Sequence, residues 1–191
     1  MIDIILTGVK SLNSLILDFQ NDINNPDMKI GDILRKALLI ATKLNIEDFV
    51  EWINLELEGY GEKDLPDYRI IKCDIRLNNA HWRNLPFIID DTKIYETIQT
   101  SHVRNSIIEI EDISSWEGSI VKLVPPIETR NLIYKYFPTT KNYEISLLSN
   151  TSQYKSIVDS VRTKLLKWSL KLEKDGIVGK NLSFSDEELK V

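Results

Sequence analysis

The side chains best suited to chemistry in this chain of 191 residues lie between Arg35 and Arg69. Trp52, Glu56 and Tyr60 follow one another at intervals of four residues, which places them along one stripe of a helix. A glutamate can act as a general base, and an arginine can contact a phosphate group through two hydrogen bonds. The sequence therefore offers a polar pocket in which Glu56 is aligned by an arginine beside an aromatic wall.

A purely structural role suits the same residues. A buried glutamate needs a partner, and Arg35 on the preceding helix or Arg69 in the following segment could supply it. Trp52 would then contribute packing alone, and Tyr68 would pack where the next strand begins. The residue types favour this structural interpretation. The residues that remain candidates for a ligand or interaction site are Arg35, Trp52, Glu56, Tyr60, Tyr68 and Arg69.

No standard catalytic motif occurs in the sequence, so no catalytic residue is assigned and enzymatic activity is left open. The chain has no Gly-x-Ser-x-Gly elbow and neither of the common glycine-rich phosphate loops. Cys73, His81 and His102 are the only sulfur or imidazole ligands, which excludes a cysteine-rich zinc site. Lys72 and Asp74 suggest a metal nuclease, but both should point to the solvated face of one strand. We therefore expect no metal and no cofactor.

The composition describes an ordinary soluble globular protein, with 42% hydrophobic and 28% charged residues. A net charge of -5 disfavours indiscriminate binding to nucleic acid and leaves a local basic patch open. One cysteine permits no internal disulfide, which fits a reducing compartment. The N-terminus lacks the basic region of a secretory signal, and no apolar run is long enough to span a bilayer. We expect a cytoplasmic protein without membrane association.

Hydrophobic periodicity predicts an α+β fold. It comprises an N-terminal bundle of three helices, a small and mostly antiparallel sheet, and a long C-terminal helix packed on the core. The expected helices cover residues 7–20, 30–44, 47–58, 92–112 with a break near Thr100, 128–137 and 152–175. The expected strands cover residues 69–77, 119–124 and 143–148.

Two glycines delimit these elements. Gly59 and Gly176 each stand where a helix should end in a left-handed cap. We therefore predict one domain over residues 1–176 and a C-terminal tail over residues 177–191. Apolar faces on both the first and the last helix favour a homodimer, although the sequence alone does not define the oligomeric state.

Several blocks of this sequence resemble the AbiTii domain of bacterial abortive-infection systems. The first run is Leu34-Arg35-Lys36-Ala37, and the most specific is Trp52-Ile53-x2-Glu56-Leu57-x-Gly59-Tyr60 followed by Pro66-x-Tyr68-Arg69. Later matches are Ser106-Ile107-x-Glu109-Ile110-Glu111 and the helical run from Val161 to Glu173. The resemblance covers about residues 5 to 175. It departs from the family where Ile71-Lys72 replaces glycines that often follow the Tyr-Arg pair.

The resemblance implies a role in bacterial immunity against phage. Such domains usually lie in prokaryotic defence loci, so the expected partner is a protein or effector of the same locus. The leading hypothesis is a non-enzymatic sensor or protein-interaction module, because the shared motif is poor in nucleophiles and bases. The alternative is a defence effector enzyme acting on nucleic acid or a nucleotide, with Glu56 as general base. A toxin-like growth inhibitor that binds a host component is a third hypothesis.

Overall fold

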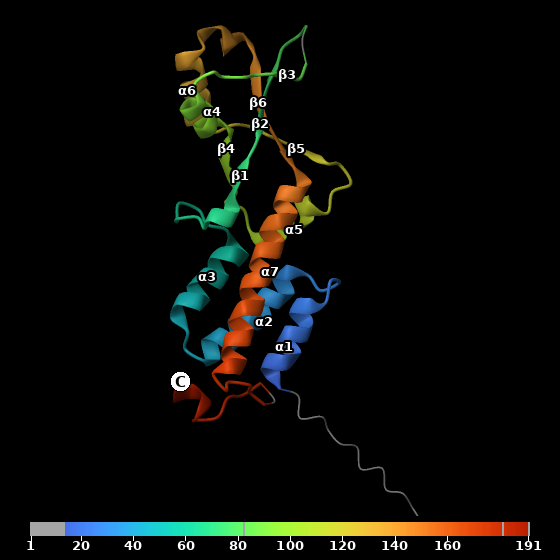
Figure 1. The fold of residues 1–191 in the computed structure, drawn as a ribbon, viewed down its shortest axis with the longest axis vertical. Helices are drawn as coiled ribbons and strands as arrows, with labels where there is room; N and C mark the ends of the chain where they lie inside the picture. Colours follow the sequence, from blue (N-terminus) through green and yellow to red (C-terminus); the bar gives the residue numbers. More distant parts are fainter. Residues whose placement is uncertain (1–13, 82, 181, 191) are drawn as a thin grey trace, which may run out of the picture. The chain divides into compact units, whose positions relative to one another are not determined.

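The computed structural model describes residues 14–81, 83–180 and 182–190 and confirms the α+β class (Figure 1). The α-helices are α1 (Leu15–Asn24), α2 (Ile30–Lys43), α3 (Glu47–Glu58), α4 (Thr92–Gln99), α5 (Ile107–Ser114), α6 (Ile127–Tyr136) and α7 (Thr151–Lys174). The strands are β1 (Ile70–Lys72), β2 (Asp74–Asn78), β3 (Leu85–Pro86), β4 (Thr100–His102), β5 (Ile120–Leu123) and β6 (Glu144–Asn150). Short 3-10 helices are η1 (Asp67–Arg69), η2 (Pro138–Asn142) and η3 (Glu188–Lys190).

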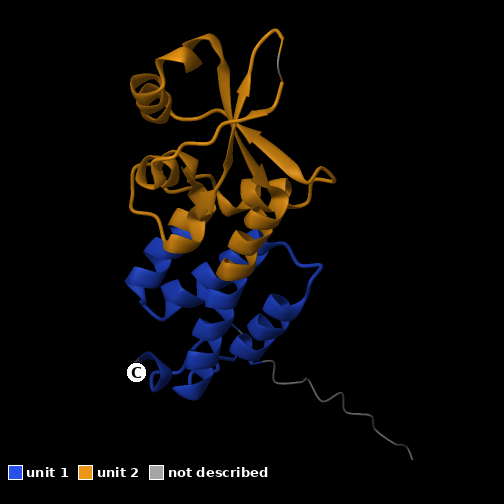
Figure 2. Ribbon diagram, turned by 45° about the horizontal axis from the view of Figure 1, so that its top comes forward, with its two compact units in different colours: residues 1–54, 162–191 blue, residues 55–161 orange. Residues whose placement is uncertain are grey.

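The chain forms two compact units (Figure 2). Unit 1 takes in the described residues up to Asn54 and those from Arg162 onward, and unit 2 spans Leu55–Val161. Helices α3 and α7 therefore each contribute residues to both units. The single domain predicted for residues 1–176 stays a prediction, and residues 7–13 of the first expected helix lie outside the described part of the chain.

Helical packing in unit 1 follows the predicted apolar stripes. Side chains such as Phe19 of α1 and Ile33 of α2 are fully buried. Arg162 of α7 donates from Nη1 to the carbonyl of Ile23 at 2.8 Å and from Nη2 to the carbonyl of Met28 at 2.9 Å. The guanidinium thus binds carbonyl groups at the end of α1 and in the loop that follows, where backbone acceptors lack helical partners.

The segment after α7, which we expected to be a tail, is part of unit 1 and bonds to the start of α1. Ile16 donates its backbone N–H to the carbonyl of Val178 at 3.1 Å. The Glu188 carboxylate accepts the backbone N–H groups of Val178 and Gly179, both at 2.8 Å, and that of Ser185 at the same distance. These bonds lower the pKa of Glu188 to about 2, with the Ser185 amide the largest cause.

Unit 2 contains two antiparallel sheets. One pairs β1 with β4, and the other has the order β3-β2-β6-β5 with Ile75 opposite Leu147. The strand expected at residues 69–77 is therefore two strands in different sheets, separated at Cys73, whose backbone N–H donates to the carbonyl of Gln99 at 2.8 Å. That bond continues the β1–β4 ladder by one residue, and the chain then enters β2 of the other sheet.

The helix expected over residues 92–112 is two helices, and the predicted break near Thr100 is strand β4. Ile70 lies opposite His102 in the β1–β4 ladder, and Lys72 opposite Thr100. Local periodicity favours helix here, but pairing with a strand about thirty residues earlier supplies the backbone partners that a continuous helix would have used.

Candidate functional site

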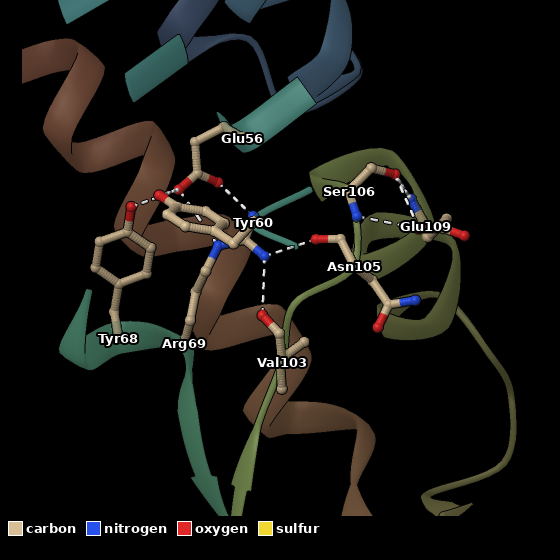
Figure 3. A network of polar contacts seen from close by, with 8 residues as sticks. All are labelled: Glu56, Tyr60, Tyr68, Arg69, Val103, Asn105, Ser106 and Glu109. Atoms are coloured by element: carbon tan, nitrogen blue, oxygen red, sulfur yellow. Dashed lines mark hydrogen bonds and ion pairs between the residues drawn. The ribbon is translucent and has the colours of Figure 1, made fainter. Parts of the chain in front are cut away.

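Four of the six candidate residues come together in unit 2 (Figure 3). Glu56 lies in the last turn of α3, and Tyr60 follows the glycine that ends this helix. Tyr68 and Arg69 belong to η1, immediately before β1. The segment from α3 to β1 thus turns back on itself and directs these side chains toward the Glu56 carboxylate.

The Glu56 carboxylate accepts hydrogen bonds on both oxygens. Its Oε1 accepts from the Tyr68 hydroxyl at 2.6 Å, the Tyr60 hydroxyl at 2.7 Å and Arg69 Nε at 3.3 Å. Its Oε2 accepts from Arg69 Nη2 at 2.5 Å. The arginine therefore contacts the carboxylate through two nitrogens, which is the geometry of a strong, oriented ion pair.

Arg69 also joins the site to the segment after β4. Its Nη1 donates to the carbonyl of Asn105 at 2.7 Å and to that of Val103 at 3.1 Å, and its guanidinium carbon lies 4.7 Å from the centre of the Tyr60 ring. Every guanidinium nitrogen has a partner. Sequence reasoning missed Val103 and Asn105, because any residue can offer a backbone carbonyl and no side-chain type marks one.

Gly59 permits the close approach on which this site depends. Its φ of +95° is in the left-handed region, as predicted for the helix cap, and a Cβ there would lie 2.9 Å from the carbonyl oxygen of Arg104. That same oxygen accepts the backbone N–H of Tyr60 at 2.9 Å. Glycine therefore lets the turn after α3 contact the segment that carries Val103 and Asn105.

A capping box starts α5 directly after this segment (Figure 3). The Ser106 hydroxyl accepts the backbone N–H of Glu109 at 3.3 Å, and Glu109 Oε2 accepts the backbone N–H of Ser106 at 3.0 Å. These reciprocal bonds satisfy two donors at the helix start. They hold the chain next to Asn105, so the carbonyl that Arg69 uses is in a defined position.

The electrostatics of the site favour a closed and neutral cluster. The Glu56 and Arg69 side chains are both 0% exposed, and their charges compensate each other. Burial raises the pKa of Tyr60 far above its ordinary value, and the hydrogen bond to Glu56 adds to the increase. Tyr60 is therefore a phenol that donates a proton in a hydrogen bond, rather than a phenolate able to attack or to abstract a proton.

Arg35 and Trp52, the other two candidates, lie in unit 1. Arg35 pairs with Asp32 one turn earlier on α2, with Nη1 2.8 Å from Oδ1, and its side chain is 59% exposed. The Trp52 ring contacts that of Phe49 at a tilt of 39°, with ring centres 4.9 Å apart, and Lys164 Nζ lies 4.2 Å from the centre of the Trp52 ring. Two arginines were expected as partners of Glu56. Arg69 forms the ion pair with Glu56, whereas Arg35 pairs with Asp32.

The described residues form neither a metal-ligand cluster nor a membrane-spanning helix. Within residues 14–81, 83–180 and 182–190, no three His, Cys, Asp or Glu side chains are grouped so that they could hold a metal ion. Among the same residues, no helix combines the length and apolar character that crossing a bilayer requires. Lys122 of β5 pairs with Glu144 of β6 at 2.8 Å on the exposed side of the sheet.

The fold and the network define a small α+β protein. Its buried Glu56–Arg69 pair links the end of α3 to the start of β1 and to the segment after β4. The chain belongs to the AbiTii family, whose model matches residues 14–191. Membership implies a role in abortive infection, a form of anti-phage defence. No curated protein matches the chain, and no solved structure matches it either.

Proposed function

We propose that this chain is a non-enzymatic sensor or protein-interaction module of an anti-phage defence system and acts in the cytoplasm. The observation that carries the proposal is that the Glu56–Arg69 ion pair is fully buried and its carboxylate is already hydrogen-bonded. A general base must offer an oxygen within hydrogen-bond reach of its substrate. Glu56 is fully buried and already accepts four hydrogen bonds, so its geometry supports a structural role.

An exposed apolar edge in unit 2 supports the interaction role. Among the strands that the structure describes, β5 pairs with β6 alone, so its other side is an edge of this sheet. Ile120 is 62% exposed and Val124, which follows the strand on the same face, is 79% exposed. Trp116 and Ile127 close to the strand are exposed as well. Apolar side chains at an open edge are suited to a partner that adds a strand.

The partner that we propose for this edge is a protein of the same defence locus. An extended segment would pair with the unpaired backbone groups of β5 and cover Ile120 and Val124. If a second copy of the chain paired edge to edge in the register that sets Lys122 opposite its own counterpart, the two like charges would destabilise the pair. Light scattering on the purified chain tests the homodimer separately.

The test is a phage challenge of cells that carry the intact locus. Deleting this chain should abolish protection, and Val124→Lys should do so without changing the melting temperature. Ile88→Lys is the matched control, since Ile88 is also 79% exposed but lies outside the β5 edge, and it should keep full protection. Unchanged protection after deletion of the chain would refute the proposed function.

Glu56→Gln separates the module from the effector enzyme acting on nucleic acid or a nucleotide. The module hypothesis expects a large fall in melting temperature and retained protection at a growth temperature where the variant is folded. If the folded variant, checked by circular dichroism, gives no protection while its melting temperature is unchanged, Glu56 acts in chemistry and the enzyme hypothesis is correct.

A further inference from the structure

Unit 1 contains a pocket that the Glu56 network does not involve. Its volume is about 540 Å³, within the range of small-molecule sites. Helices α3 and α7 supply most of its walls, and the segment after α7 closes one side. The residues that line it are Leu44, Ile46, Asp48, Phe49, Trp52, Lys164, Trp168, Lys171, Leu172, Asp175, Ile177, Glu188 and Leu189.

Three aromatic rings form a continuous row in the wall of this pocket. Phe49 stacks on Trp168 with ring centres 4.2 Å apart and planes 24° apart, and it lies 4.9 Å from the ring of Trp52. Phe19 contacts Trp168 edge-on from within the bundle, at 6.1 Å. The three pocket rings are half-buried. Their orientations are thus set by packing before any ligand arrives, while part of their surface remains accessible.

Charged side chains of both signs surround the aromatic row. Lys164 and Lys171 are seven residues apart on α7, which places them on one face of the helix. Lys164 Nζ lies 4.2 Å from the Trp52 ring centre, so a positive charge adjoins the aromatic surface. Asp48 and Asp175 also line the pocket. The Glu188 carboxylate lines the pocket too, and it accepts hydrogen bonds from the backbone N–H groups of Val178, Gly179 and Ser185.

A ligand that matches all these features carries a planar ring, an anionic group and several hydrogen-bond donors. Aromatic side chains bind nucleobases by stacking, ammonium groups bind phosphate, and carboxylates accept bonds from ribose hydroxyl groups. We propose that the pocket binds a mononucleotide. The two carboxylates disfavour a long nucleic acid, which would bring many phosphates past Asp48 and Asp175, and the net charge of -5 disfavours it further.

This inference deepens the proposed function, because it names the chemical class that a sensor would detect. Both α3 and α7 line the pocket, and each helix also contributes residues to unit 2. Occupation of the pocket would stabilise the paired arrangement of the two helices within unit 1, since a ligand that binds only the folded form raises its stability.

Isothermal titration calorimetry on the full chain at low salt tests the inference. The probes are AMP, GMP, CMP and UMP, with adenosine to isolate stacking and inorganic phosphate to isolate the charge contribution. At least one nucleotide should bind with a Kd below about 1 mM, and adenosine should bind roughly tenfold more weakly than AMP, the size expected for charge-assisted hydrogen bonds.

Two substitutions assign the binding to this pocket. Lys171→Gln should weaken the nucleotide about tenfold and leave adenosine unchanged, because it removes a charge and no aromatic surface. Trp52→Leu should weaken both ligands about tenfold through lost stacking. Lys155→Gln and Tyr136→Leu, in exposed positions of unit 2, are the matched controls and should bind as the unchanged protein does. Circular dichroism verifies that each variant is folded.

Several outcomes would overturn the inference. These are the absence of binding by all four nucleotides, equal binding of adenosine and AMP, binding explained by phosphate alone, or unchanged affinity in the Lys171→Gln variant. If nucleotides fail to bind while deletion of the chain still abolishes phage protection, the proposed function stands and the inference fails. If a nucleotide binds but deletion of the chain leaves phage protection intact, the inference stands and the proposed function fails.

Discussion

Arg69 Nη2 lies 2.5 Å from Glu56 Oε2, and neither side chain is exposed to solvent. The pair joins the end of α3 to the start of β1, and Arg69 extends the link to Val103 and Asn105. Removing water from two charges is costly, and the geometry offsets this cost only while both charges and all their hydrogen bonds are present. The pair is therefore sensitive to the loss of either member.

Arg69→Met should lower the free energy of unfolding by roughly 3–5 kcal/mol, because it leaves the Glu56 carboxylate buried without its counter-charge. Urea unfolding followed by circular dichroism measures this change. In the double variant Glu56→Leu, Arg69→Met, the loss should be clearly smaller than the sum of the two single losses. Additive losses would contradict a coupled ion pair.

Gly59→Ala should destabilise the protein more than Gly61→Ala. Both glycines have positive φ, +95° and +47°, so alanine is strained at each. Only at Gly59 would the new Cβ also meet the Arg104 carbonyl oxygen, at 2.9 Å, whereas nothing lies within 4 Å at Gly61. Urea unfolding compares the two, and equal losses would show that the close approach contributes nothing.

Cys73 should react slowly with thiol reagents in the folded protein. Burial raises the pKa of its thiol to about 11, and the nearby Asp74 charge adds to the increase. The thiolate is the reactive form, so at neutral pH it is scarce as well as inaccessible. Labelling with a chromogenic disulfide should be fast in denaturant and slow without it. Fast labelling of the folded chain would show that the region between β1 and β2 opens readily.

Glu188→Gln should destabilise the protein at pH 6 and have little effect near pH 2. The folded pKa of Glu188, about 2, lies below its ordinary value of 4.5, so the carboxylate contributes stability above pH 4.5. That contribution is lost as the pH falls from 4.5 toward 2. Unfolding in urea at several pH values measures the difference between variant and unchanged protein. Glu187, the residue before Glu188, is exposed and serves as the control. Glu187→Gln should show no such pH-dependent difference in stability.

Local hydrophobic periodicity is enough to predict several helices of this protein. The helices expected over residues 30–44, 47–58 and 152–175 occur as α2, α3 and α7 with ends within one residue, and the Gly59 cap is present. An amphipathic stripe and a glycine that tolerates positive φ are properties of a few consecutive residues. These helices and the cap at Gly59 can therefore be inferred from short stretches of sequence.

Which side chains pair with one another depends instead on contacts between distant parts of the chain. The sequence left Arg35 and Arg69 as equal partners for Glu56, and the structure pairs Glu56 with Arg69 while Arg35 binds Asp32. It also placed strand β4 at the predicted break in the helix expected over residues 92–112. Both outcomes depend on contacts between residues far apart in the chain, and their free energies are sums over strand pairing and burial that no short window of sequence contains.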